Sequence, residues 1–144
     1  MTRARLNQLN LVVRDVEVSQ GFYERLGLGM GRGGDPQWAA HHLSAEPGDP
    51  EALGVDLDSI AFAGLWDEGW PGGTGVVLGF SVDTRAEVDE LVAALAADGV
   101  LVQQAPYDAF WGARYAVVAD PDGNAVGIMS PVEEAFRSTP PPPP

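Results

Sequence analysis

The sequence contains no cysteine and no lysine, and it has few basic residues of any kind. Without cysteine there can be no disulfide, thiolate nucleophile or zinc–thiolate site. The 8 basic residues are all arginine, they stand against 21 acidic residues, and the formal net charge is −13. A chain this acidic repels phosphate backbones and anionic lipid surfaces, so we expect neither a nucleic-acid partner nor a membrane partner. Its field favours a neutral or cationic ligand.

Long apolar runs are missing as well. No stretch approaches the roughly 20 residues that cross a bilayer. Residues 1–5 lack the apolar stretch of a signal peptide, so we expect a cytoplasmic protein. A length of 144 residues suits one domain with a proper core. We place this domain at residues 1–132 and a proline-rich tail at 133–144, and we expect the end of the tail to be mobile and inert.

What the chain does contain is one strand-plus-helix pattern that occurs twice. Aligned on each other, the two copies pair Leu9 with Leu78. A repeat of this kind predicts two similar modules with the site between them. We expect module one at about 5–58, a linker at 59–74 and module two at about 75–131.

Local signals predict the same order of elements in each module, namely a strand, a helix and three further strands. Asp15 is a helix N-cap and Gly27 a helix end, and residues 84–87 form a capping box for the second helix. The strands expected in module one are 5–14, a short one within 29–34, 37–44 and 52–58. Those expected in module two are 75–83, 100–104, 114–119 and 125–130, the last after a tight turn at 120–124.

Two segments resemble the vicinal-oxygen-chelate superfamily, which holds the glyoxalases, ring-cleaving dioxygenases and bleomycin- or fosfomycin-resistance proteins. The first is residues 11–15 with Phe22, Tyr23 and 26–27, and the second is residues 111–124. The likeness covers residues 5 to about 131. It implies an α+β fold in which two βαβββ modules form a cupped mixed sheet around a cavity, and it implies pairing as a homodimer.

The same resemblance identifies the positions of a metal site. Metal-dependent members place one ligand on the first strand and one on the last strand of each module. Aligned by motif, these positions hold Gln8, Asp56, Val77 and Gly127. Valine and glycine side chains offer no donor, so the implied site is badly incomplete. We expect no metal and no cofactor, and the sequence leaves open whether Gln8 and Asp56 hold any ion.

The two histidines, His41 and His42, are neighbours on one expected strand, so at most one faces the cup. The sequence does not say which. We expect no catalytic residue, although a metal-free enzyme that uses His42 or Asp56 as a base stays open.

The aromatic residues favour a binding pocket. All four tryptophans fall in or beside segments rich in proline and glycine. A large aromatic side chain in a surface loop is costly unless it covers something, and tryptophan stacks on flat ligands and attracts cations. The expected ligand-binding residues are the aromatic Trp38, Phe62, Trp66, Trp70, Tyr107, Phe110 and Trp111, together with the polar Gln8, Asn10, His42, Asp56 and Arg114.

These observations lead to an antibiotic-binding protein similar to the metal-free bleomycin-resistance proteins. We expect it to confer resistance by sequestering a bulky aromatic natural product, without chemistry, in a cleft at the interface of a homodimer. The alternatives are a metal-dependent glyoxalase- or dioxygenase-like enzyme and a metal-free enzyme on the same fold. The sequence does not distinguish a glycopeptide, an enediyne, a quinone or a flavin-like ligand.

Overall fold

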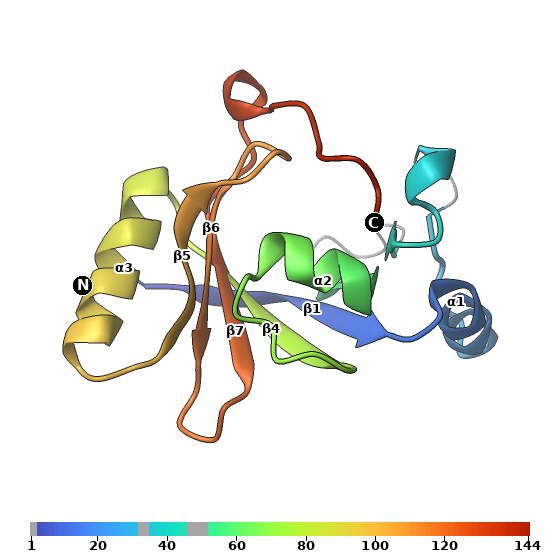
Figure 1. Ribbon diagram of the computed structural model, residues 1–144, viewed down its shortest axis with the longest axis horizontal. Coiled ribbons are helices and arrows are strands. Elements are labelled where there is room, and N and C mark those ends of the chain that lie inside the picture. Colours follow the sequence, from blue (N-terminus) through green and yellow to red (C-terminus); the bar gives the residue numbers. More distant parts are fainter. Residues whose placement is uncertain (1–2, 32–34, 46–51) are drawn as a thin grey trace.

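The computed structural model describes residues 3–31, 35–45 and 52–144. One seven-stranded mixed sheet forms its centre, with the strand order β2-β3-β1-β4-β7-β6-β5 (Figure 1). The strands are β1 (Arg5–Val13), β2 (His42–Ser44), β3 (Gly54–Ser59), β4 (Gly75–Ser81), β5 (Val102–Asp108), β6 (Arg114–Ala119) and β7 (Ala125–Met129). The helices are α1 (Val16–Arg25), α2 (Ile60–Trp66), α3 (Arg85–Ala97) and the short 3-10 helices η1 (Pro36–Trp38) and η2 (Glu134–Phe136). The predicted α+β fold is confirmed.

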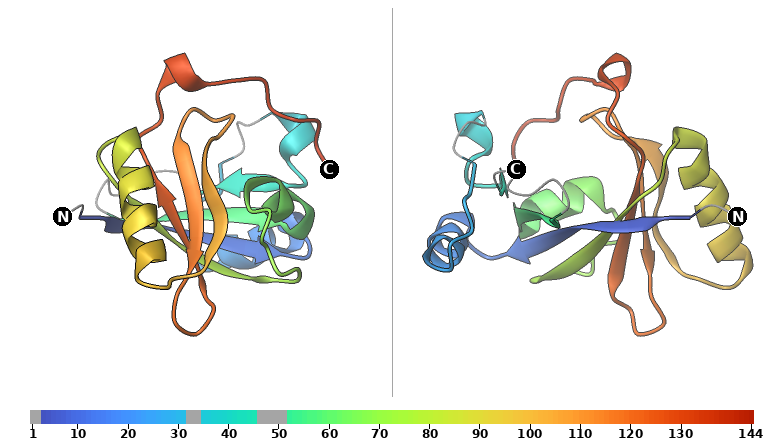
Figure 2. Two further views of the ribbon diagram at one scale, coloured as in Figure 1. Left: turned by 60° about the vertical axis from the view of Figure 1, so that its left-hand side comes forward. Right: turned by 180° about the vertical axis from the view of Figure 1, so that it is seen from behind.

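The two halves of the chain join along β1 and β4. These strands pair antiparallel, and Leu9 lies opposite Leu78, the residue with which the sequence repeat aligns it. Each strand has a parallel neighbour on its other side, β3 beside β1 and β7 beside β4. A parallel neighbour needs a crossover connection, and each half has a helix in that connection, α1 in the first and α3 in the second. β1 and β5–β7 cross at a steep angle, so the sheet is cupped (Figure 2).

The second half contains all five predicted elements, from β4 through α3 to β7, but the first half differs from the prediction. The strand expected within 29–34 is reduced to one bridge between Met30 and Ala45, and residues 32–34 lie outside the described residues. The strand expected from residue 37 begins only at His42. Asp35 caps η1 there, with its side chain accepting from the Gln37 N–H and a proline in the first turn.

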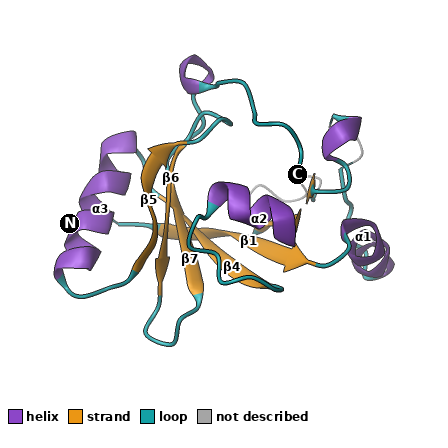
Figure 3. Ribbon diagram, in the orientation of Figure 1, coloured by secondary structure: helices purple, strands orange, loops and turns teal. Residues whose placement is uncertain are grey.

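Alternating side chains on the strands separate two cores on opposite faces of the sheet. On β6, Tyr115 and Val117 face α2 and pack in a cluster with Phe62 and Trp66. Ala116 and Val118 face the other way and pack with residues of α3. A third, smaller cluster, Val16, Met30 and Leu57, holds α1 against β3. Accordingly α2 lies inside the cup, while α1 and α3 lie at its two ends (Figure 3).

Helix termini follow the sequence signals. Asp15 Oδ1 accepts a hydrogen bond from the Val18 N–H at 3.0 Å, and Gly27 adopts a φ of 92° just past the end of α1. No helix in the described ranges is long and apolar enough to cross a membrane.

The capping box of α3 yields a first prediction. The Thr84 hydroxyl accepts from the Glu87 N–H at 3.2 Å, and the Glu87 carboxylate accepts from the Thr84 N–H at 3.1 Å. Thr84→Ala should lower the free energy of unfolding by about 0.5–2 kcal/mol, because one helix donor loses its acceptor. Thr84→Ser keeps the acceptor and should stay near the native value. Urea denaturation measures both, and equal losses in the two variants would contradict the capping role.

Candidate functional site

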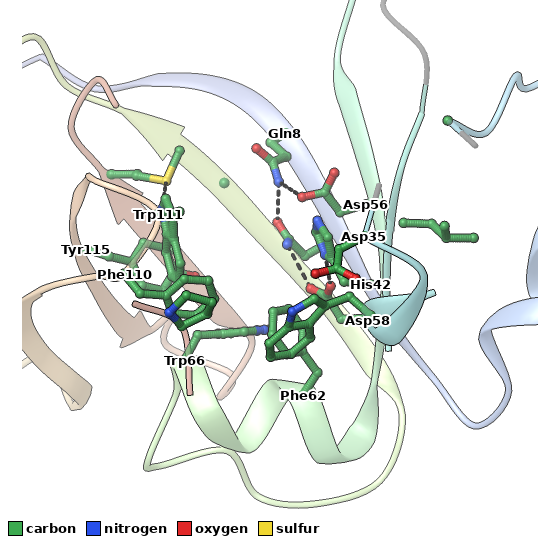
Figure 4. Close-up of a pocket in the computed structure, with 18 of the residues that line it drawn as sticks. Gln8, Asp35, His42, Asp56, Asp58, Phe62, Trp66, Phe110, Trp111 and Tyr115 are labelled. Atoms are coloured by element: carbon green, nitrogen blue, oxygen red, sulfur yellow. Dashed lines mark hydrogen bonds and ion pairs between the residues drawn. The ribbon is translucent and has the colours of Figure 1, made fainter. Parts of the chain in front are cut away.

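A cavity of about 620 Å³ lies on the concave face of the sheet. Both halves of the chain line it, from β1, β2 and β3 on one side to β6, β7 and the loop before β6 on the other. Figure 4 shows that the two sides differ in chemistry: aromatic side chains gather around Trp111, and amide, carboxylate and imidazole groups gather around Asp56. The cavity is therefore apolar at one end and polar at the other.

The aromatic end is a continuous set of rings in mutual contact. The Phe110 and Trp111 centroids are 5.2 Å apart, Trp111 and Tyr115 are 5.5 Å apart, and Tyr115 and Trp66 are 6.1 Å apart. On the other side of the cavity, Trp38 reaches across from η1. Its ring lies 6.2 Å from Phe110, nearly parallel to it, and 5.4 Å from Phe62. Rings held by one another in this way are preorganised to receive a flat ligand.

The polar end comes from neighbouring positions on three adjacent strands. Asn10 lies opposite Asp56, and His42 lies opposite Asp58, so these side chains share one face of the sheet. Gln8 Nε2 donates to Asp56 at 2.6 Å and to Asn10 at 3.0 Å.

Two further hydrogen bonds extend this network to Asp58, which is only 1% exposed. Asn10 Nδ2 donates to Asp58 Oδ2 at 3.1 Å, and His42 Nδ1 lies 2.6 Å from Asp58 Oδ1. The structure also settles which histidine faces the cup. His42 lines the cavity, whereas Nδ1 of His41 lies 3.0 Å from the hydroxyl of Ser59, the N-cap residue of α2.

The electrostatics of the polar end are acidic. Burial by itself would lower the pKa of His42, but the hydrogen bond and charge of Asp58, with the charge of Asp56, raise the pKa above its ordinary value. Burial also raises the pKa of Asp56, although the charge of His42 opposes this shift. The lining includes a third carboxylate, Asp35, and among the described residues it includes no arginine.

Nine of the twelve predicted ligand-binding residues line the cavity, and three do not. Trp70 packs behind Trp66, with ring centroids 6.0 Å apart, and its Nε1 donates to Gly73 O. Tyr107 lies under the aromatic end, and its hydroxyl donates to Trp66 O at 3.1 Å. Arg114 points to the outer face, where it pairs with Asp89 at 2.8 Å and Asp108 at 3.3 Å. The structure therefore places these three residues outside the lining of the cavity.

The prediction also missed residues that the cavity contains. Strand alternation could have identified two of them, Asp58 and Tyr115. Each shares one face of its strand with a residue that is predicted to bind ligand or is buried. Met129, which accepts a hydrogen bond from Trp111 Nε1 at 3.4 Å, follows from the pairing of β6 with β7. Pro140 lines the cavity from the tail, and no sequence signal indicates it.

Comparison with known proteins identifies the family. A model described as the Glyoxalase/Bleomycin resistance protein/Dioxygenase superfamily matches residues 5–128. The chain belongs to this superfamily.

Solved structures support this fold assignment. The Mn(II)-bound glyoxalase from Novosphingobium aromaticivorans is 20% identical with a TM-score of 0.63, and the match covers 90% of this chain and 40% of that one. A superfamily member from Vibrio splendidus is 21% identical with a TM-score of 0.58, covering 90% and 100%. A variant of homoprotocatechuate 2,3-dioxygenase from B. fuscum is 19% identical with a TM-score of 0.63, covering 92% and 34%. No curated protein matches the sequence.

The residues at the superfamily's metal positions do not fit a metal ion. Gln8 turns its amide nitrogen, a donor, toward Asp56, and Val77 is fully buried with no polar atom in its side chain. A Cβ added at Gly127 would lie 2.7 Å from the Tyr115 hydroxyl, so that phenol fills the space of a ligand side chain. The described residues contain no group of three His, Cys, Asp or Glu side chains that could hold an ion.

The Gly127–Tyr115 contact yields a second prediction. Gly127→Ala should lower the free energy of unfolding by about 1–3 kcal/mol, because the new methyl group overlaps the buried Tyr115 ring. In a Tyr115→Phe background the nearest atom is gone, so the cost of the same substitution should shrink. Gly64→Ala in α2, where no heavy atom lies within 4 Å, is the matched control and should stabilise slightly. Urea denaturation of the four variants measures the coupling, and additive effects would contradict the contact.

The Asp58–His42 contact yields a third prediction. Because the folded-state pKa of His42 is raised above 6.5, its unperturbed value, the contact stabilises the fold fully below that pH. The contribution is lost as the pH rises through the folded-state pKa. An NMR titration should give His42 a pKa above 6.5. Asp58→Asn should lower this pKa, because burial lowers it and the Asp58 carboxylate is the main group that raises it. His41→Gln assigns the resonance, and an unchanged His42 pKa in Asp58→Asn would remove the carboxylate as the cause.

Proposed function

We propose that this protein binds a bulky aromatic compound, neutral or cationic, in the cavity and sequesters it unchanged, which would protect a cell from a toxic natural product. One observation carries the proposal. A single cavity holds a continuous aromatic wall that faces a buried acidic network. We further propose that the protein works as a cytoplasmic homodimer, as in the resistance proteins that it resembles.

The size and lining of the cavity suit a drug-sized ligand. Small-molecule pockets are typically about 300–1,000 Å³, mostly apolar, with a few placed polar groups. The rings of Trp38 and Phe110 are nearly parallel, stack on each other at 6.2 Å and both line the cavity, so a flat ring system can contact both. Trp66 is 4% exposed and contributes one ring of this apolar lining.

Charge selects among aromatic ligands. Asp35, Asp56 and Asp58 line the cavity together with His42, which balances only one carboxylate when protonated. An anionic ligand would meet repulsion in a poorly solvated space, whereas an amine near the network gains an opposite charge and cation–π contacts. We therefore propose a ligand with an aromatic body and a neutral or basic polar end.

The cavity needs no second chain for the residues named here, because both halves of one chain supply them. Our sequence-based expectation put the cleft at the interface of two chains. In the revised proposal each protomer of a dimer has a complete cavity of its own, and the homodimer gives two equivalent sites.

A second candidate function rests on the contact between His42 and Asp58. A buried carboxylate that orients an imidazole in a ligand cavity is also an arrangement for general-base catalysis without a metal. Sequestration leaves the ligand unaltered, whereas catalysis changes it, so one experiment that measures the mass of the ligand separates the two functions.

Native mass spectrometry of metal-stripped protein with a charge series on one ring system tests the proposal. The compounds are cationic 9-aminoacridine, neutral acridine and anionic acridine-9-carboxylate, followed by a panel of aromatic antibiotics. We expect one unaltered molecule per chain for the cation and the neutral compound, and none for the anion. A product of changed mass favours the enzyme, binding only after metal addition overturns the metal-free proposal, and no binding by any compound overturns the proposal itself.

The aromatic wall yields a fourth prediction, for the dissociation constant of 9-aminoacridine. Trp38→Ala should weaken binding by about 1–3 kcal/mol, because a stacking face is lost. Trp70→Ala is the matched control: it removes a tryptophan that packs behind the wall, so affinity should change far less. Isothermal titration calorimetry of both variants, with urea denaturation to compare their stability, decides the point. Equal losses of affinity would mean that the effect is on folding and not on the site.

A further inference from the structure

The C-terminal tail does not leave the molecule after β7. In all views it rises from β7, turns at η2 and then runs across the concave side, ending beside η1 and β2 (Figures 1 and 2). Pro140 lines the cavity, and Pro143 is partly buried. The tail thus spans from the aromatic end of the cavity to the opposite rim.

The first part of the tail is fixed to the loop that carries the aromatic wall. The Glu133 N–H donates to Gly112 O at 3.0 Å, and the Ser138 N–H donates to Phe110 O at 3.1 Å. Between them, Arg137 forms a β-bridge with Trp111. These contacts tie the base of the tail to the same backbone that positions Phe110 and Trp111.

Arg85 reinforces this base from α3. Its guanidinium lies 3.8 Å from the centre of the Phe136 ring and donates to Gly112 O at 3.0 Å. A cation over an aromatic face combined with a hydrogen bond to the neighbouring loop holds η2 in one orientation. The tail therefore starts from a defined point and direction.

The last part of the tail is held differently. Within the described ranges, no hydrogen bond holds residues 139–144 to the rest of the chain. Residues 140–144 are all proline, which has no N–H donor and favours a stiff, extended polyproline II conformation. Five such residues extend about 15 Å at about 3.1 Å each. A stiff arm on a fixed base can swing open without breaking hydrogen bonds of its own.

We propose that residues 139–144 form a hinged strap over the cavity, which opens to admit the ligand, closes on it and slows its release. The inference rests on the proposed function, because it names the segment that regulates the same site. Closure places Pro140 against the bound ligand and adds apolar contact on the side that the sheet leaves open. Since entry and exit share one opening, the strap slows both steps, and contact with the ligand slows exit more.

Stopped-flow fluorescence with 9-aminoacridine tests the strap on the full chain and three variants. The first variant ends at Ser138. The second is Ser138→Pro, which removes the N–H bonded to Phe110 O, and Arg137 already has the φ of −66° and ψ of 140° that a following proline accepts. The third, Ser138→Ala, keeps the N–H and is the matched control. Urea denaturation checks that all variants fold.

We expect the truncated chain and Ser138→Pro to release the dye about tenfold faster than the full chain, with a smaller increase in the association rate. Ser138→Ala should match the full chain. Release from the truncated chain at the native rate would overturn the strap, and so would equal changes in Ser138→Ala and Ser138→Pro.

A measurement without ligand separates failure of the strap from failure of the proposed function. In a Trp70→Phe background the three remaining tryptophans, Trp38, Trp66 and Trp111, all line the cavity. Acrylamide should quench their fluorescence more strongly after truncation at Ser138. Stronger quenching with no dye binding by any chain would support the strap as a cover but overturn the binding function. Dye binding with unchanged quenching and unchanged rates would overturn the strap alone.

Discussion

The antiparallel pairing of β1 with β4 is the constraint on which the rest of the molecule depends. It joins the two halves into one sheet and determines which side chains enter the cup. Because strand side chains alternate, a slip of one residue would turn Leu9 inward and Gln8 outward. Gly79 supports the observed register at Gln8, because a Cβ at that position would lie 2.9 Å from the Cβ of Gln8. The β1–β4 pairing thus sets the aromatic end opposite the polar end, whereas the polar network itself comes from the pairing of β3 with β1 and β2.

The elements that local signals specify could be predicted, and those that depend on contacts across the cup could not. The capping box at Thr84 and the repeat that aligns Leu9 with Leu78 are visible in the sequence alone, and the structure has both. η1 was missed although Asp35 followed by proline is a helix-start signal, because the aromatic residue after it favoured a strand. Arg114 could have been excluded by alternation once Tyr115 faced inward. Nothing local indicates that Pro140 returns to the cavity, because that position depends on contacts far along the chain.

The two halves diverge at the positions that the repeat makes equivalent. The first half keeps polar groups there, Gln8 and Asp56, whereas the second half has Val77 and Gly127. Burying carboxylates costs free energy even when hydrogen bonds satisfy them, and the second half builds the same strands without any. The fold therefore does not require the acidic network. Buried titratable groups that the fold does not need, in a cavity, are characteristic of functional sites. The divergence produces a cavity with two chemically different ends, which orients any ligand that has two different ends.

The short first half also explains why a tail is useful at this place. β2 has three residues, and Met30 contributes a single bridge where the second half has a full strand. The tail ends beside this edge of the sheet (Figure 1). A tail that lies over this edge encloses a ligand without an additional sheet strand, whose hydrogen bonds would have to break at each entry and exit. A proline arm has no such bonds, so it can combine enclosure with access.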